Sequence, residues 1–357
     1  MLSMLPPDDL PFPGGQTLGA QQGFRTAALE ATMAMRLGAR HAIAVGSPTV
    51  AFVVAYRASG VPAGASVVTT SLADPTVVRA AVASGLRPRF VDVDARGQLA
   101  PAALAEHAAL RDAPALVVPS HWAGHPCDPA PLAAAAPGTL VVEDAIDALG
   151  ACHADGRPVG APPHAGLTVV GIHPVRASAP AQGAVLLTDD EMLAARCRAL
   201  RDERPEYRLS ELHAALATIQ LGRLAGFVGL RTRIAARYDA AMTEHPLATP
   251  IGPVAGASSA WTTYPLHVPA WARAELLGRL ARAGIGGRRV ALLLHRHPYF
   301  ARCADVLPAE LPATERFAAE TVVLPTSPVL EDAEVRRVVD ALAPVASRGA
   351  DDVAVAG

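Results

Sequence analysis

Short apolar runs alternate with longer amphipathic stretches from about residue 41 to residue 189. The runs that predict β-strands are HAIAVG at 41–46, SVVTTS at 66–71, RPRFVDVD at 87–94, ALVVPS at 115–120, GTLVVEDA at 138–145, LTVVGIH at 167–173 and GAVLLTD at 183–189. Helical patterns precede the first run at 25–37 and follow the first two at 49–59 and 75–85. Strands that alternate with helices of this length predict an α/β fold with a mainly parallel central sheet, flanked by helices on both faces.

The remaining third of the chain predicts a second, smaller unit. A long helical pattern runs from Ser210 to about Ala241 and ends before the break HPLATP. A strand pattern at 263–268 and helical patterns at 274–284 and 331–345 follow. We therefore expect an N-terminal arm (1–24), a large α/β domain (25–240), a small C-terminal α/β domain (241–345) and a flexible tail (346–357).

Polar residues gather where the predicted strands end. In open α/β sheets, ligands bind beyond the carboxyl ends of the strands, so this clustering predicts a site. The residues in question are Ser47 and Thr49 after the first run, Asp74 after the second, His121 after the fourth, Asp144 and Asp147 at the fifth, and His173 and Arg176 at the sixth. Their spacing matches no recognised metal-ligand pattern, and we expect no metal.

Charge and composition narrow the class of protein. The net charge of −2 gives no basic surface for nucleic acid. No apolar segment is long enough to predict a membrane span, and the N-terminus does not resemble a signal peptide. The four cysteines are scattered, as in a reduced protein, so we expect a cytoplasmic location. Most unusual is that all 31 basic residues counted as Lys or Arg are arginine, so the chain contains no lysine.

Several segments together resemble the DegT-type nucleotide-sugar aminotransferase family, which has the pyridoxal-phosphate (PLP) fold type I. The resemblance covers nearly the whole chain. It is carried by VVTTSLADPTVVRAAVASGLRPRFVDVD, SHWAGHPCD, VVEDAIDALGA, IHPVR, YRLSELHAALATIQL and LPTSP. It implies an aminotransferase-like fold, a dimer with its sites at the interface, and a role in sugar or secondary-metabolite biosynthesis.

Part of the family's cofactor site is present in this sequence. Asp144 matches the aspartate that pairs with the pyridine nitrogen of PLP, where a carboxylate keeps the ring protonated. Ser47 and Thr49 match the phosphate-binding turn at a helix N-terminus. His121 and Arg208 match further positions of the family pattern.

Other positions depart from that pattern. Arg176 stands where the family has the lysine of the internal aldimine, and a guanidinium does not condense with aldehydes at neutral pH. The remaining departures replace a stacking aromatic residue by Asp74, a backbone N–H by Pro48, a glutamine by Asp147, a hydroxyl residue by Gly171, and a trans-subunit asparagine by Glu206. From these changes we expect no bound cofactor and, in particular, no productive PLP binding.

Three functions remain open. The first is a PLP-independent repurposed enzyme that performs acid–base chemistry on a small anionic intermediate. Its candidate catalytic residues are Asp74, His121, Asp144, Asp147, His173 and Arg176, with Glu206 and Arg208 contributed across a dimer. The second is an inert partner subunit in a heterodimer with a lysine-bearing homologue. The third is an enzyme that uses PLP or pyridoxamine phosphate (PMP) without an internal aldimine.

Overall fold

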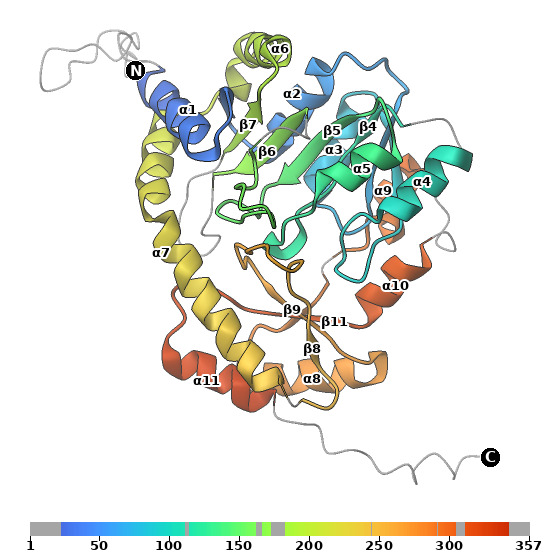
Figure 1. The fold of residues 1–357 in the computed structure, drawn as a ribbon, viewed down its shortest axis with the longest axis vertical. Helices are drawn as coiled ribbons and strands as arrows, with labels where there is room; N and C mark the ends of the chain where they lie inside the picture. The colour runs from blue at the N-terminus through green and yellow to red at the C-terminus, as the bar shows by residue number, and fades with distance from the viewer. Residues whose placement is uncertain are drawn as a thin grey trace, which may run out of the picture.

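The computed structural model describes residues 23–110, 114–161, 166–172, 183–243, 245–290, 292–304 and 311–342 (Figure 1). Most of the predicted arm and all of the predicted tail lie outside these ranges, as do His173 and Arg176. Among the helices of these ranges, not one combines the length and the apolar character that a membrane span requires.

The larger of two sheets has seven strands in the order β1-β7-β6-β5-β4-β2-β3. The strands are β1 (His41–Val45), β2 (Ser66–Thr70), β3 (Arg87–Val91), β4 (Leu116–Val117), β5 (Leu140–Ala145), β6 (Leu167–Gly171) and β7 (Ala184–Thr188). β7 pairs antiparallel with both of its neighbours, and the other pairings are parallel. The prediction of a mainly parallel sheet is confirmed.

Helices cover both faces of this sheet, which explains why the strands read as continuous apolar runs. On β1, Ile43 and Val45 join one core cluster, whereas Ala42 and Ala44 join another on the opposite face. The first cluster packs beneath α2 (Pro48–Ala58), α3 (Pro75–Ala83) and α6 (Glu191–Asp202), and the second packs beneath α1 (Phe24–Leu37) and the first half of α7 (Glu211–Met242). α4 (Pro101–Leu110) and α5 (Pro129–Ala135) cover the far end of the sheet.

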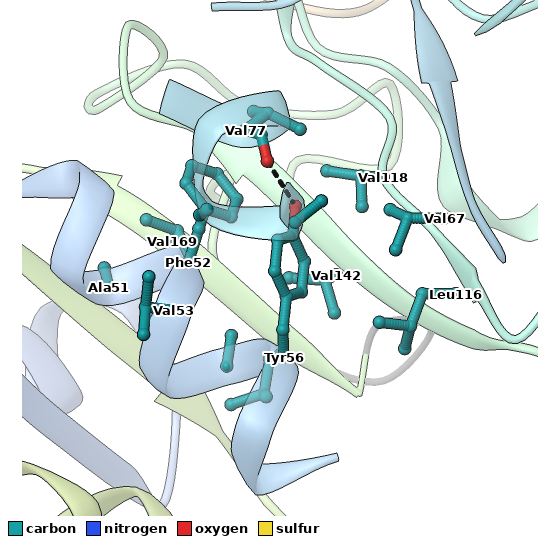
Figure 2. Close-up of a cluster of buried hydrophobic side chains, with 14 of the residues drawn as sticks. Ala51, Phe52, Val53, Tyr56, Val67, Val77, Leu116, Val118, Val142 and Val169 are labelled. Atoms are coloured by element: carbon teal, nitrogen blue, oxygen red, sulfur yellow. Dashed lines mark hydrogen bonds between the residues drawn. The ribbon is translucent and has the colours of Figure 1, made fainter. Parts of the chain in front are cut away.

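Figure 2 shows part of the first cluster, where side chains of α2 lie over the central strands. The ring of Tyr56 is buried among them, and its hydroxyl donates to the carbonyl of Val77 on α3 at 3.3 Å. This bond satisfies the one polar atom of the ring, so α2 and α3 can pack closely without leaving a buried donor unpaired.

The second sheet is smaller and antiparallel, with the order β10-β11-β9-β8. Its strands are β8 (Thr249–Pro250), β9 (Tyr264–His267), β10 (Arg288–Arg289) and β11 (Thr321–Leu324), and it packs with α8 (Ala270–Arg282) and α11 (Asp332–Ala341). Figure 1 shows α7 running from beside α1 down to this small unit. The predicted domain boundary at residue 240 falls in the last turn of α7.

Candidate functional site

A cavity of about 190 Å³ lies between the strand ends of the large sheet and the face of the small sheet. Its volume far exceeds the roughly 10–15 Å³ that one water molecule needs, so it can hold a ring-sized ligand. The large-domain wall consists of residues 72–75, 120–123, 144, 146 and 147, and the small-domain wall consists of residues 263, 288–290, 292 and 323. Four predicted site residues line it together: Asp74, His121, Asp144 and Asp147.

Asp144 is the most deeply buried carboxylate of this wall. It lies at the end of β5, where its Oδ2 accepts a hydrogen bond from the Ser120 hydroxyl at 2.7 Å. Burial raises the pKa of Asp144 to about 7, the Ser120 bond opposes this rise, and the negative charges of Asp74 and Asp147 add to it. Among the described residues, no cation opposes the raised pKa of this carboxyl, and a cationic ligand atom would stabilise its ionised form.

His121 is held at both ring nitrogens by the protein. The backbone N–H of Cys127 donates to Nδ1 at 2.8 Å, and Nε2 lies 2.8 Å from Oε2 of the buried Glu143. Because Nδ1 accepts a bond, the single proton of the neutral ring sits on Nε2 and is donated to Glu143. With both nitrogens engaged, the ring can offer the cavity only its face and its carbon atoms.

Asp74 stabilises a helix end and also lines the cavity. It caps the N-terminus of α3, where its Oδ1 accepts from the backbone N–H and from the hydroxyl of Thr76 at 2.9 and 2.8 Å. A cap of this kind typically contributes about 1 kcal/mol to stability. The local sequence Asp-Pro-Thr, with proline at the first helical position, accounts for this geometry.

Asp147 lies within electrostatic reach of an arginine that the sequence did not single out. Arg231 is 4% exposed, in the middle of α7. Burial lowers the pKa of Arg231, and the charge of Asp147 opposes that shift. The Nε atom of Arg231 has no hydrogen-bond partner in the described part of the chain. An arginine inside a helical pattern usually faces water, so only the fold reveals this buried charge.

The predicted phosphate-binding turn lies beside a turn that contains the predicted trans-subunit residues. Ser47 caps α2 by accepting from the N–H of Val50 at 3.2 Å, and Gly46 donates its backbone N–H to Tyr207 at 2.9 Å. A side chain at residue 46 would approach the carbonyl of Arg208 to 3.1 Å, which explains the glycine. Ser47, Thr49, Glu206 and Arg208 are not part of the cavity wall. The side chains of Glu206 and Arg208 are exposed.

One buried cluster at the cavity edge was not predicted. Nδ1 of His295 lies 2.7 Å from Oγ of Ser71, and Nε2 lies 2.8 Å from Oε1 of Glu315 on α10 (Pro312–Ala319). His295 lies within the short 3₁₀ helix Leu294–Arg296, directly after the apolar run ALLL. That run was the only sequence signal that this histidine is buried.

The fold and the cavity define a protein with the architecture of PLP fold-type-I aminotransferases. The chain belongs to the DegT/DnrJ/EryC1/StrS aminotransferase family, whose model matches residues 16–343. S. venezuelae DesV, solved in complex with a ketimine intermediate, is 27% identical, with a TM-score of 0.79 over 89% of this chain and 88% of DesV. The sugar aminotransferase CalS13 from Micromonospora echinospora is 25% identical, with a TM-score of 0.80 over 91% of this chain and 94% of CalS13.

A further structure of the same fold, the putative sugar aminotransferase Spr1654 from Streptococcus pneumoniae, has been solved in a PLP form and in a PMP form. At 19% identity, with a TM-score of 0.79 over 89% of this chain and 90% of that chain for the PLP form, it shows the fold alone.

The expectation that no cofactor binds is wrong. The chain has the fold and the family of aminotransferases that use PLP. The physical reason is that an absent lysine removes one covalent bond, whereas the ring and the phosphate of PLP are also bound by other groups. Of these groups, the buried Asp144 carboxylate fits the protonated ring nitrogen of PLP, because that nitrogen would supply a cation that the described residues around Asp144 do not.

Proposed function

We propose that this protein binds PLP or PMP without a covalent bond and acts with it on a sugar or a related small anionic intermediate. The observation that carries the proposal is the Asp144 carboxylate, which is buried at the wall of the cavity and has a pKa raised to about 7. Membership of a family of aminotransferases involved in sugar biosynthesis supports the substrate class.

Each of three described residues would have its own role in holding the cofactor. Asp144 would hold the ring nitrogen in its protonated state, and Ser120 would fix the carboxylate that does so. His121, with its orientation fixed by Glu143 and Cys127, would confine the ring on one side. When bound, PLP or PMP supplies an electron-withdrawing ring that stabilises negative charge on carbon.

Proton transfer must come from groups other than a lysine, because the chain has none. The carboxylates of Asp74 and Asp147 line the same cavity as Asp144. Carboxyl groups can accept and donate protons in acid–base catalysis, so Asp74 and Asp147 are the candidates for this transfer.

A homodimer is the assembly that fits the surface of α1 and α7. These two helices pack together, and their outer faces expose the side chains of Met35 (78%), Leu212 (68%) and Ile219 (60%). Large apolar side chains exposed on neighbouring helices are typical of protein–protein interfaces. The same face would serve the alternative function, an inert subunit paired with a lysine-bearing homologue.

The test of cofactor binding is a titration of the purified protein with PLP and with PMP. Trp122 lines the cavity, so quenching of tryptophan fluorescence can be read beside isothermal calorimetry. We expect saturable binding that Asp144→Asn weakens about tenfold or more, because the amide cannot compensate a cationic nitrogen. The matched control is Asp155→Asn, on the surface. An absence of binding to either compound by the wild-type chain would overturn the proposal.

Coexpression separates the enzyme from the inert partner. A heterodimer with a lysine-bearing homologue whose activity survives Asp144→Ala in this chain would favour the partner function. A homodimer whose activity Asp144→Ala abolishes would favour the enzyme. Size-exclusion chromatography with light scattering identifies the assembly in each case.

A further inference from the structure

Two consecutive arginines, Arg288 and Arg289, form strand β10 at the small-domain wall of the cavity. Successive side chains of a strand point to opposite faces of the sheet. Only one of the two guanidinium groups can therefore extend from the face that looks into the cavity.

The pairing of β10 with β11 identifies which one. In this antiparallel pair Arg288 lies opposite Val323, and Arg289 lies opposite Val322. Residues directly opposite one another share a face of the sheet. Val323 lines the cavity, whereas Val322 is fully buried in the small-domain core with Leu280 of α8. Both residues line the cavity, but the pairing directs the side chain of Arg288 toward it and the side chain of Arg289 toward α8.

Contacts of the neighbouring residues agree with this assignment. Val290, two positions after Arg288 and so on its face, packs with Leu72 of the large domain and with Phe317 of α10. On the other face, burial lowers the pKa of Arg273 on α8, and the positive charge of Arg289 adds to that effect. Two independent neighbours thus place Arg288 toward the large domain and Arg289 away from it.

Arg288 faces a wall of opposite charge. The large-domain side of the cavity bears the carboxylates of Asp74, Asp144 and Asp147. Arg288 nevertheless makes no ion pair within 4.0 Å with any residue of the described ranges, and its side chain is exposed. The cavity is therefore polarised, with an unpaired guanidinium on one side and carboxylates on the other.

We propose that Arg288 binds an oxyanion of the substrate and so selects substrates that carry a phosphate or carboxylate group. A guanidinium presents its N–H donors as a planar fork that matches both groups in bidentate geometry. The inference rests on the proposed function, since it assumes that the cavity is the substrate site. It adds the residue that recognises the anionic part of that substrate, at the side of the cavity opposite Asp144.

The phosphate of a sugar nucleotide and the carboxylate of an amino-acid donor share this chemistry, and calorimetry with two probes distinguishes them. UDP-glucose serves as the phosphate probe and L-glutamate as the carboxylate probe, each titrated into the full-length wild type, Arg288→Gln and Arg289→Gln. We expect Arg288→Gln to weaken binding of one probe by about tenfold or more. A third variant, Arg282→Gln, changes an exposed arginine of α8 that does not line the cavity, and it should change binding less than twofold. Arg288→Lys, measured without PLP, should lose an intermediate amount because it keeps the charge but not the fork.

Arg282→Gln is the control, since it removes the same group from outside the cavity wall, and Arg289→Gln compares the two positions of β10. Equal losses in Arg288→Gln and Arg282→Gln, a loss in Arg289→Gln as large as in Arg288→Gln, no loss in Arg288→Gln, or no binding of either probe to the wild type would each overturn the proposal. Circular dichroism of the variants checks that β10 is intact. PLP binding, followed by tryptophan fluorescence on the same samples, reports separately on the proposed function. If the wild type bound UDP-glucose but not PLP, the role of Arg288 in substrate binding would stand and the proposed cofactor would be refuted.

Discussion

Oγ of Ser71 and Nδ1 of His295 lie 2.7 Å apart, although 224 residues separate them in the chain. Ser71 directly follows β2, and His295 follows the small-domain residues that line the cavity. The backbone N–H of His295 also donates to Oγ of Ser71 at 3.1 Å, and Nε2 binds Glu315 of α10. This cluster bonds the segment that follows β10 to the end of β2, next to the cavity-lining residue Leu72.

Replacement of His295 should therefore loosen the joint between the domains. His295 is 3% exposed, and His295→Ala would leave the Ser71 hydroxyl and the Glu315 carboxylate without their partner. We expect a loss of about 2–3 kcal/mol in the free energy of unfolding, measured by urea denaturation. His267→Ala is the control, since that side chain is half exposed and lies 3.8 Å from Glu320. Equal effects of the two substitutions would refute a clamp at His295.

The stability of the cofactor-free protein should fall as pH rises toward 7 because of Asp144. Its carboxyl has a pKa of about 7 in the folded protein and about 3.9 when unfolded. Between these values the folded state keeps a proton that the unfolded state has released. The free energy of unfolding therefore decreases with rising pH, by at most about 1.4 kcal/mol per pH unit from this one group.

Asp144→Asn should remove that slope between about pH 4 and pH 7. Urea denaturation of both proteins at several pH values measures it. Asp155→Asn is the control, because the hydrogen bond from the Arg157 side chain lowers the pKa of Asp155 and moves its contribution to more acidic pH. Saturating PLP should flatten the wild-type slope too, since a cationic nitrogen beside Asp144 lowers its pKa. Parallel pH curves for wild type and Asp144→Asn would contradict this account.

Glu143 should be needed for the position of the His121 ring. It accepts the only proton that the neutral imidazole carries, in surroundings closed to water. Glu143→Leu leaves that buried N–H unpaired and should cost about 1–3 kcal/mol of folding stability. Glu143→Gln keeps an acceptor oxygen and should cost less than half as much. Thermal and urea unfolding check the difference, with the exposed Glu191→Leu as the surface control; an equal cost for Leu and Gln at residue 143 would show that the bond is unimportant.

The sequence predicted those parts of the site that follow strand ends. Apolar runs in the sequence correspond to β5 and the other strands of the large sheet. The polar residues His121, Asp144 and Asp147, which the sequence analysis selected at the ends of such runs, line one cavity. What it could not predict depends on contacts distant in the chain. The antiparallel direction of β7 leaves no trace in an apolar run. The sequence alone predicts that Arg231 faces water, as most arginines within helices do, although the fold buries it. The face of the sheet from which Arg288 extends follows only from the register of β10 against β11. The expected absence of a cofactor failed because six departures from the family pattern were weighed above Asp144 and above the family fold that the chain retains.

A lysine-free chain offers an unusually clean test of the position of the missing amine. Arg176, outside the described residues, stands where the family resemblance places the lysine. In Arg176→Lys the new residue is the only lysine side chain of the protein.

We expect borohydride treatment with PLP to leave a stable adduct that peptide mass spectrometry assigns to residue 176, and none on any side chain of the wild type. Arg233→Lys, exposed on α7, is the matched control for unspecific labelling. Free PLP condenses slowly with any exposed amine, but a bound aldehyde held beside an amine reacts at a far higher effective concentration. Stoichiometric labelling at 176 and trace labelling at 233 would therefore locate the cofactor. Equal labelling at the two positions would mean that residue 176 does not adjoin it.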